Sequence, residues 1–215
     1  MDLVPFTVHH PGNWQIIAPS FGGKTRLVAE ILERRHETFS VPIESIVFVY
    51  SEFQPIYYKL MDKIPQIKFT TSIDEAETLV ESPGIIVFDD IMDRLSNSEN
   101  IRKLTSWWTT KGHHRGISCL ALLQNAYHKG LRELSLSNHY VVLFRQPRDM
   151  NTVSVISRQV CPYQTKFLVE AFRIATDQKE FSYIFLNLHP KDGNYKYFVR
   201  SSIWPEKDCV IFAPK

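Results

Sequence analysis

The chain has 215 residues, of which 44% are hydrophobic and 22% are charged, and its formal net charge at pH 7 is +2. These proportions are those of an ordinary folded protein, and they argue against intrinsic disorder and a collagen-like repeat. Because the net charge is small, the chain is not a polycation. Any binding of nucleic acid must therefore come from a local basic surface.

The cysteines and the N-terminal segment indicate in which cellular compartment the protein is expected. Cys119, Cys161 and Cys209 are not at metal-ligand spacing, and an odd number of cysteines cannot close completely into disulfides. No stretch approaches the roughly 20 apolar residues of a membrane span, and no secretory signal is visible at the start of the sequence. We therefore expect an intracellular protein that is not secreted and has no membrane partner.

Short apolar runs alternate with amphipathic stretches along the whole chain, with no linker or repeat between them. This alternation predicts an α/β fold in which a mostly parallel central sheet is flanked by helices. We expect a single domain over residues 1–215, with a core over about 5–150 and a C-terminal extension over about 151–215. The expected strands cover residues 14–18, 45–50, 85–88, 117–123, 140–144, 182–188 and 197–201.

Four helices are expected from spacing and capping signals. Residues 24–35 and 166–175 carry apolar side chains at helical spacing. Two further helices are expected to begin after Ser72 and after Ser96, because each serine is followed three residues later by a glutamate. In such a capping box, the serine and glutamate side chains accept hydrogen bonds from exposed backbone N–H groups at the helix start.

The most informative segment matches the phosphate-loop pattern with alanine in place of the first glycine: Ala18-Pro19-Ser20-Phe21-Gly22-Gly23-Lys24-Thr25. It follows an expected strand and opens an expected helix, so backbone N–H groups and the helix dipole can surround the phosphates of a nucleotide. Lys24 supplies a positive charge, and Thr25 is expected to place its hydroxyl on Mg²⁺. Gly22 and Gly23 permit close approach of the backbone. We predict that this segment, together with Arg26, binds ATP; the alternative is an ordinary turn before a helix.

Two adjacent carboxylates, Asp89 and Asp90, follow the expected strand over 85–88. A strand of a parallel sheet delivers such side chains to the carboxyl edge, where a nucleotide binds. Asp89 is predicted to hold Mg²⁺ directly or through water, and Asp90 to orient or deprotonate the attacking water. The alternative is a helix N-cap after a core strand.

Gln124 ends the expected strand over 117–123, and Arg115 stands before its start. Gln124 is predicted to sense the γ-phosphate and to orient water beside the nucleotide. At about 3.3 Å per residue, a strand of this length separates its ends by roughly 20 Å, so Arg115 cannot reach the same nucleotide. Two interpretations stay open: Arg115 enters the site of a neighbouring subunit and stabilises the transferring phosphoryl group, or it is a surface arginine.

The strand over 117–123 follows the acidic strand, and it has an arginine, Arg115, before its start and a glutamine, Gln124, at its end. In this arrangement the chain resembles the FtsK-HerA superfamily of P-loop ATPases. Further segments are similar to the genome-packaging ATPases of Polinton (Maverick) elements and adintoviruses: Pro5-Phe6, His114-Arg115-Gly116-Ile117-Ser118 with Leu123-Gln124-Asn125, and Ser135-Leu136-Ser137-Asn138-His139-Tyr140 with Phe144-Arg145-Gln146-Pro147-Arg148-Asp149. The chain departs from the family at Ala18, Phe21, Gly22 and Asp90, and the shorter carboxylate of Asp90 must be brought closer to its water.

The resemblance implies a P-loop NTPase fold of the additional-strand type. It also implies a homo-oligomeric ring that hydrolyses ATP with Mg²⁺ and drives double-stranded DNA into a capsid, in contact with viral capsid proteins. The expected place is the host nucleus or cytoplasm, where virions assemble. Two other functions stay open from the residues: a scaffold that binds nucleotide without turnover, and a small-molecule P-loop kinase.

Several basic residues are candidates for contact with DNA phosphates, or are ordinary surface charges: Lys129, Arg132, Arg145, Arg148 and Arg158. Arg148 is also a second candidate for an arginine that acts between subunits.

Aromatic and histidine residues also stand out. Trp107 and Trp108 are adjacent on an expected helix and point about 100° apart, so we expect at most one in the centre of the core. The other is expected to be partly exposed, unless a wide apolar face covers both rings. Two pairs of adjacent histidines are expected in loops or helix caps rather than at a metal site: His9 and His10, and His113 and His114. A group of aromatic residues is expected either in the core or stacked on nucleic-acid bases: Tyr50, Phe53, Tyr57 and Tyr58.

Overall fold

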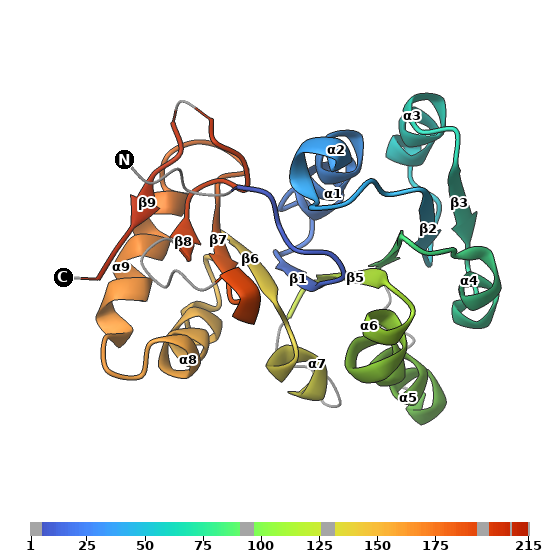
Figure 1. Cartoon of the computed structure of the whole chain (residues 1–215). Helices are drawn as coiled ribbons and strands as arrows, with labels where there is room; N and C mark the ends of the chain where they lie inside the picture. Colours follow the sequence, from blue (N-terminus) through green and yellow to red (C-terminus); the bar gives the residue numbers. More distant parts are fainter. Residues whose placement is uncertain (1–5, 91–96, 126–131, 193–197, 207, 215) are drawn as a thin grey trace.

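The computed structural model describes residues 6–90, 97–125, 132–192, 198–206 and 208–214 (Figure 1). Within these ranges nine strands form a single sheet in the order β3-β2-β4-β5-β1-β6-β7-β8-β9. The strands are β1 (Asn13–Ile17), β2 (Ser45–Val49), β3 (Ile67–Thr70), β4 (Gly84–Asp89), β5 (Ile117–Leu123), β6 (Tyr140–Phe144), β7 (Tyr183–Asn187), β8 (Val199–Arg200) and β9 (Ile211–Phe212).

The sheet is parallel from β3 to β6 and antiparallel from β6 to β9. In the parallel part, the last residue of β1, Ile17, pairs with Leu123 at the end of β5. Asp89 at the end of β4 pairs with Leu122 of β5. The segments that follow β1, β4 and β5 therefore meet at one edge of the sheet, which we call the carboxyl edge.

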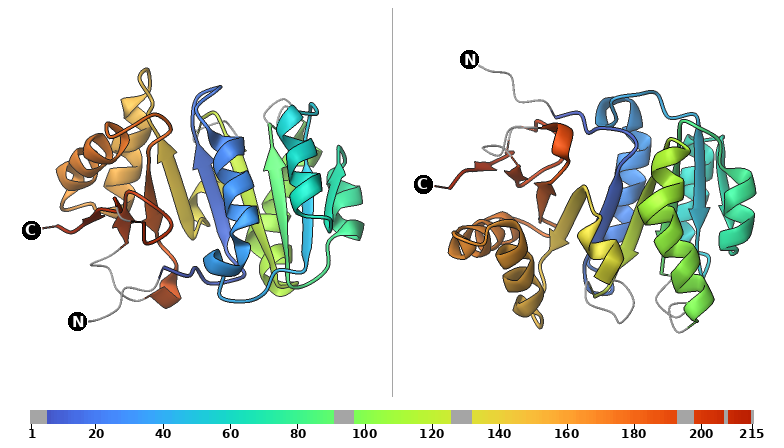
Figure 2. Two further views of the ribbon diagram at one scale, coloured as in Figure 1. Left: turned by 90° about the horizontal axis from the view of Figure 1, so that it is seen from above. Right: turned by 60° about the horizontal axis from the view of Figure 1, so that its bottom comes forward.

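Helices cover both faces of the sheet (Figure 1). They are α1 (Lys24–Glu33), α2 (Arg35–Thr38), α3 (Pro55–Lys63), α4 (Ile73–Leu79), α5 (Ser98–Ser106), α6 (Gly112–His114), α7 (Arg132–Leu136), α8 (Met150–Val160) and α9 (Thr165–Thr176). One core cluster packs α1 and α3 against the sheet, and a second packs α4, α5, α8 and α9 against the opposite face. The C-terminal elements, from α8 to β9, gather at the end of the sheet opposite β3 (Figure 2).

The architecture confirms the predicted α/β fold and the strands that build its centre. The five central strands lie within one or two residues of their expected positions, and α1 begins at Lys24 as expected. Burial explains this agreement, since every residue of β1, β2, β4, β5 and β6 is buried and most of these residues are apolar. The two late strands also join the sheet, although the expected start of the second, Tyr197, lies outside the described residues.

The two helix-start signals have different outcomes. The helix after Ser72 is confirmed, and the Ser72 side chain accepts a hydrogen bond from the Glu75 N–H at 3.2 Å. The reciprocal bond of a capping box is not formed, because the Glu75 carboxylate accepts instead from the Thr70 hydroxyl, while the Ser72 N–H donates to Thr70 Oγ1. At the second site the N-cap is Asn97, which accepts from the Glu99 N–H at 2.8 Å; Ser96 lies outside the described residues.

Of the two interpretations of the adjacent tryptophans, the wide apolar face that covers both rings is the correct one. Trp107 and Trp108 are both buried, with exposed fractions of 1% and 2%. They open a π-helical turn over Trp107–Lys111, which changes the spacing of side chains relative to an α-helix. The Trp108 indole donates to Asn138 Oδ1 at 2.8 Å, so its polar atom is satisfied in the interior. Both rings belong to the core on the α5 side of the sheet.

Candidate active site

The predicted phosphate loop connects the end of β1 to the start of α1 at the carboxyl edge. Gly23 caps α1 with a φ of 96°, in the left-handed region that glycine adopts without strain. A Cβ at Gly22 would lie 2.8 Å from Ala18 Cβ and 2.9 Å from the Pro19 carbonyl oxygen, so the loop is too tight for a side chain there. The two glycines therefore have the backbone roles that the pattern predicts.

Lys24 begins α1 and folds its side chain back over the loop. Its Nζ donates to the Ala18 carbonyl at 2.8 Å and to the Pro19 carbonyl at 3.1 Å. Burial lowers the pKa of Lys24, and the negative charges of Asp89 and Asp90 oppose this change. The ammonium thus lies at the mouth of the loop between backbone carbonyls and carboxylates, where a phosphate oxygen could replace the carbonyls as its partner.

Asp89 is the centre of a buried hydrogen-bond group. Its Oδ2 accepts from the Thr25 hydroxyl at 3.1 Å and from the Tyr57 hydroxyl at 2.9 Å. Only 2% of Asp89 is exposed, and burial raises the pKa of its carboxyl group, although the two hydroxyl donors act in the opposite direction. A metal cation in contact with such a desolvated carboxylate would stabilise its charged form.

These residues fit a magnesium ion. Thr25 and Asp89, the two predicted ligands, are in contact and point to the same place, and oxygen atoms are the ligands that Mg²⁺ prefers. Bound with a nucleotide, Mg²⁺ would neutralise phosphate charge. Among the described residues, no group of three or more His, Cys, Asp or Glu side chains could hold a metal ion by itself.

Tyr57 is a site residue that the sequence analysis did not identify as such. It lies on α3 and is fully buried, and burial together with the charge of Asp89 raises its pKa far above the ordinary value. The hydroxyl therefore stays protonated and donates to Asp89. The sequence offered one signal, because Pro55 suits the first position of a helix and would bring the aromatic residues onto a helix facing the sheet.

We expect Tyr57→Phe to weaken magnesium binding at the site without unfolding the chain. Loss of the hydroxyl removes a donor from the Asp89 carboxylate, so the pKa of Asp89 rises further and its anionic form is populated only at higher pH. The acid limb of the pH–rate profile for ATP hydrolysis should move to higher pH, and more Mg²⁺ should be needed. Tyr58→Phe is the matched control, since Tyr58 is on the same helix and 65% exposed; equal effects of both changes would contradict this role.

Asp90 and Gln124 meet at the exposed mouth of the site. Gln124 Nε2 donates to Asp90 Oδ1 at 3.3 Å, and the Asp90 carbonyl accepts from the Ser51 hydroxyl at 2.8 Å. Asp90 has a φ of 53°, an uncommon left-handed conformation for aspartate that turns the chain sharply after β4. The two side chains predicted to handle water and γ-phosphate are thus in contact, while Asp89 remains inside.

Arg115 lies at the other end of β5, away from the carboxyl edge, as the strand length predicts. It donates to the Glu77 side chain at 3.4 Å and to the Glu77 carbonyl at 3.2 Å, and its guanidinium lies over the Trp107 ring. It cannot contribute to the candidate site of its own chain. Its action between subunits stays a prediction.

Three of the other basic candidates are exposed: Arg145, Arg148 and Arg158. Arg145 follows β6 and forms an exposed ion pair with Asp177 at 3.5 Å, while Arg148 and Arg158 are exposed near and along α8. Lys129 lies outside the described residues, and Arg132 begins α7. Nothing in these positions distinguishes DNA contacts from ordinary surface charge, so both interpretations of them stay predictions.

Two of the remaining sequence candidates make packing or hydrogen-bond contacts away from the phosphate loop: His10, and the aromatic group around Tyr57. His10 contacts the Gly116 carbonyl at 2.9 Å and the Ser118 hydroxyl at 2.7 Å, which holds the segment before β1 against β5. The aromatic group forms ring contacts around the buried Tyr57, and Tyr50 and Phe53 both pack against it. The core interpretation of these aromatic residues is therefore the correct one for Tyr57.

The chain was compared with known proteins. No family model matches it, and no curated protein matches it. Among solved structures, it is similar to the DNA-packaging ATPase B204 from Sulfolobus turreted icosahedral virus, with a TM-score of 0.55 at 13% identity over 83% of this chain and 94% of that one. The chain has the fold of a P-loop ATPase.

Two further matches have the same P-loop ATPase fold. The genome-packaging NTPase B204 from Sulfolobus turreted icosahedral virus 2 in complex with AMP has a TM-score of 0.57 at 10% identity, over 95% of this chain and 98% of that one. The cytoplasmic domain of the type VII secretion ATPase EccC from Thermomonospora curvata has a TM-score of 0.54 at 13% identity, over 94% of this chain and 25% of that one. In the described part of the chain, no helix is long and apolar enough to cross a membrane.

Proposed function

We propose that this protein is a magnesium-dependent ATPase that drives double-stranded DNA into a viral capsid as a homo-oligomeric ring. The observation that carries the proposal is the meeting of Lys24, Thr25, Asp89, Asp90 and Gln124 at one edge of the sheet. The P-loop ATPase fold supports it, because the solved structures similar to this chain include genome-packaging ATPases.

Each side chain then has a chemical role. The backbone of the loop and Lys24 bind the β- and γ-phosphates, and Thr25 and Asp89 hold Mg²⁺. Asp90 accepts a proton from the attacking water or orients it, since its carboxylate is exposed at the mouth of the site. Gln124 is hydrogen-bonded to Asp90. When a γ-phosphate binds, the Gln124 amide can contact it, and this contact changes the hydrogen bond to Asp90.

The finer parts of the proposal rest on the sequence resemblance to the packaging ATPases of Polinton elements and adintoviruses. They are the DNA substrate, the ring, the capsid proteins as partners, and action in the host nucleus or cytoplasm where virions assemble. A scaffold that binds nucleotide without turnover has the same phosphate loop, and the absence of hydrolysis in the presence of DNA would favour it.

Mixing two inactive variants tests the ring. Arg115→Ala should preserve ATP binding and lower hydrolysis on the order of 10³-fold, because an arginine supplied to a neighbouring site stabilises the transition state. In mixtures with Lys24→Ala, subunits that lack Lys24 still offer Arg115 to subunits that lack Arg115, so part of the activity should return. Glu77→Gln is the control for the local contact of Arg115. Failure of every mixing ratio to recover hydrolysis would argue against action between subunits.

A further inference from the structure

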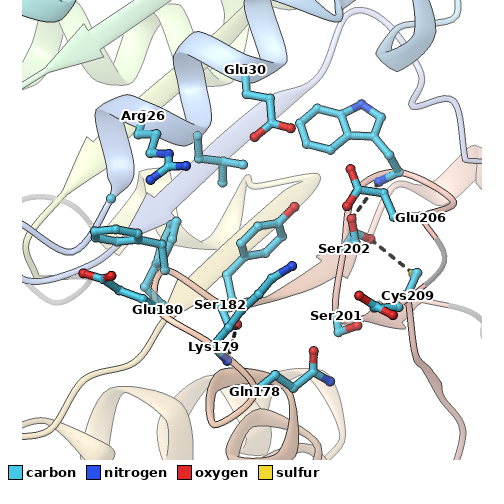
Figure 3. Close-up of a pocket in the computed structure, with 17 residues that line it drawn as sticks. Arg26, Glu30, Gln178, Lys179, Glu180, Ser182, Ser201, Ser202, Glu206 and Cys209 are labelled. Atoms are coloured by element: carbon cyan, nitrogen blue, oxygen red, sulfur yellow. Dashed lines mark hydrogen bonds between the residues drawn. The ribbon is translucent and has the colours of Figure 1, made fainter.

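The two sides of the phosphate loop are built differently. In the sheet, β1 lies between β6 on one side and β5, β4 and β2 on the other. On the β6 side a hollow of about 480 Å³ opens between α1, whose Arg26 and Glu30 face it, and two C-terminal segments within residues 178–183 and 201–209 (Figure 3). On the β5 side the segments that follow three neighbouring strands are joined by hydrogen bonds. Asp90 and Gln124, the residues predicted to handle water, lie on this second side.

Asp90 is the residue at which these hydrogen bonds meet. Strand β4 lies between β2 and β5, and Asp90 is the first residue after it. The Gln124 side chain, which follows β5, donates to Asp90 Oδ1 at 3.3 Å. The Ser51 hydroxyl, which follows β2, donates to the Asp90 carbonyl at 2.8 Å. One neighbour therefore holds the carboxylate of Asp90, and the other holds its backbone.

The parallel pairing of β2 with β4 explains why Ser51 reaches this carbonyl. Val49, the last residue of β2, pairs with Phe88 of β4. Two residues farther along each segment, Ser51 and Asp90 therefore lie beside each other. The hydroxyl of a serine is one carbon atom away from the backbone, so this bond ties the two segments together at close range.

The backbone of Asp90 adopts a conformation that needs such a restraint. Its φ of 53° is in the left-handed region, which is uncommon for residues other than glycine. A residue keeps such a conformation only where the surrounding structure imposes it. The bond from Ser51 acts on the Asp90 carbonyl, directly after this torsion. Without it, Asp90 can return to a right-handed or extended conformation, which would turn its carboxylate away from Gln124.

Ser51 is itself supported by aromatic packing. Tyr50 and Phe53, which flank it, both pack against Tyr57, with ring centres 5.6 Å and 5.2 Å apart. Tyr57 is fully buried, and its hydroxyl donates to Asp89. The segment that presents the Ser51 hydroxyl is therefore fixed to the core that also holds Asp89. A side chain on such a segment can serve as a rigid support for the turn after β4.

We propose that Ser51 is a positioning residue for ATP hydrolysis, whose hydroxyl holds Asp90 in the conformation that presents the carboxylate to the attacking water. The inference rests on the proposed function, because it takes Asp90 as the group that orients or deprotonates that water. Ser51 acts only through Asp90. It should therefore govern the rate of hydrolysis and leave unchanged the affinity for ATP, which the phosphate loop and Lys24 provide.

The first arm of the test measures kcat for ATP hydrolysis and the equilibrium affinity for ATP. Ser51→Ala should lower kcat on the order of 10- to 100-fold, because a small displacement of a general base costs that much, while the affinity stays within about twofold. Ser51→Thr keeps the hydroxyl and should recover most of the rate. Ser154→Ala is the matched control, since the Ser154 hydroxyl also donates to a backbone carbonyl, that of Met150 in α8 at 3.0 Å; it should change neither quantity.

The second arm asks whether Ser51 acts through Asp90. Asparagine tolerates the left-handed conformation but offers no base, so Asp90→Asn is the background for this arm. In it, Ser51→Ala should lower the residual hydrolysis, measured in single turnovers, by less than about twofold. A purely structural role of Ser51 would lower the rate by the same factor in both backgrounds. If the background shows no measurable hydrolysis, the first arm decides.

The outcomes separate this inference from the proposed function. A lower kcat at unchanged ATP affinity, with recovery in Ser51→Thr, supports the positioning role. An unchanged kcat in Ser51→Ala, equal losses of kcat and ATP affinity, or the same loss in the Asp90→Asn background overturns it and leaves the phosphate loop intact. Failure of the wild type to hydrolyse ATP overturns the proposed function, and the inference falls with it. If Ser51→Ala does not fold, Ser51→Thr and Ser51→Val decide, because their side chains have the same shape and differ in the hydroxyl.

Discussion

Asp89→Asn should lower ATP hydrolysis by about 10²- to 10³-fold and at the same time raise the thermal stability of the nucleotide-free protein. Hydrolysis falls because the amide provides no negative charge for Mg²⁺ at the buried end of β4. Stability rises because the change removes a carboxylate that is nearly fully buried. The amide oxygen can still accept from Thr25 and Tyr57, so the local hydrogen bonds need not be lost.

The pH dependence of stability provides a second readout of Asp89. Because its pKa is raised in the folded state, its contribution to the free energy of unfolding is largest at low pH and is lost as pH rises through the raised pKa. In Asp89→Asn this loss should be absent, and thermal unfolding followed across that pH range detects it. Asp62→Asn, at an exposed position of α3, is the control. Lower stability of Asp89→Asn at every pH would contradict the account of Asp89 as a buried carboxylate whose charge destabilises the folded chain.

Lys24→Ala should abolish measurable hydrolysis and weaken ATP binding on the order of 100-fold. The Lys24 ammonium is the positive charge at the mouth of the loop, and alanine leaves only backbone N–H groups there. The fold should tolerate the change, because the ammonium bonds only loop carbonyls and alanine is a good helix former at the start of α1. Equilibrium binding and phosphate release measure the two effects.

The control for Lys24→Ala is Lys59→Ala, which removes an exposed lysine from α3 and should change neither quantity. A Lys24→Ala protein that binds ATP as tightly as the wild type would mean that the loop does not hold the phosphates. A protein that binds ATP normally but does not hydrolyse it would restrict the role of Lys24 to the transition state.

The parts of the fold that the sequence predicted share one physical property. β1, β4, β5 and β6 are buried on both faces, so most of their residues are apolar. Their parallel pairing delivers the phosphate loop, Asp89 and Gln124 to one edge of the sheet. The elements α3 and β3 were not predicted. Strand β3 has an exposed residue, Lys68, in its middle, and its pattern is too short and mixed to stand out.

The candidate site shows a similar division. The residues that belong to local motifs could be predicted, since a loop before a helix and carboxylates after a strand are visible in the chain itself. Tyr57 reaches the site from a segment far from those motifs, through its hydrogen bond to Asp89. The π-helical turn that buries both tryptophans is also set by packing, because the hydrogen bond from Trp108 to Asn138 joins distant parts of the chain.

The most direct test is steady-state ATP hydrolysis by the wild type and by Lys24→Ala, each with and without double-stranded DNA, over a range of protein and salt concentrations. We expect DNA to stimulate the wild type, with a steep dependence on protein concentration because subunits must assemble, and with less stimulation as salt rises. Lys24→Ala should show no hydrolysis under any of these conditions. Hydrolysis by the wild type that is indifferent to DNA and proportional to protein concentration would contradict a DNA-driven ring and indicate a monomeric NTPase.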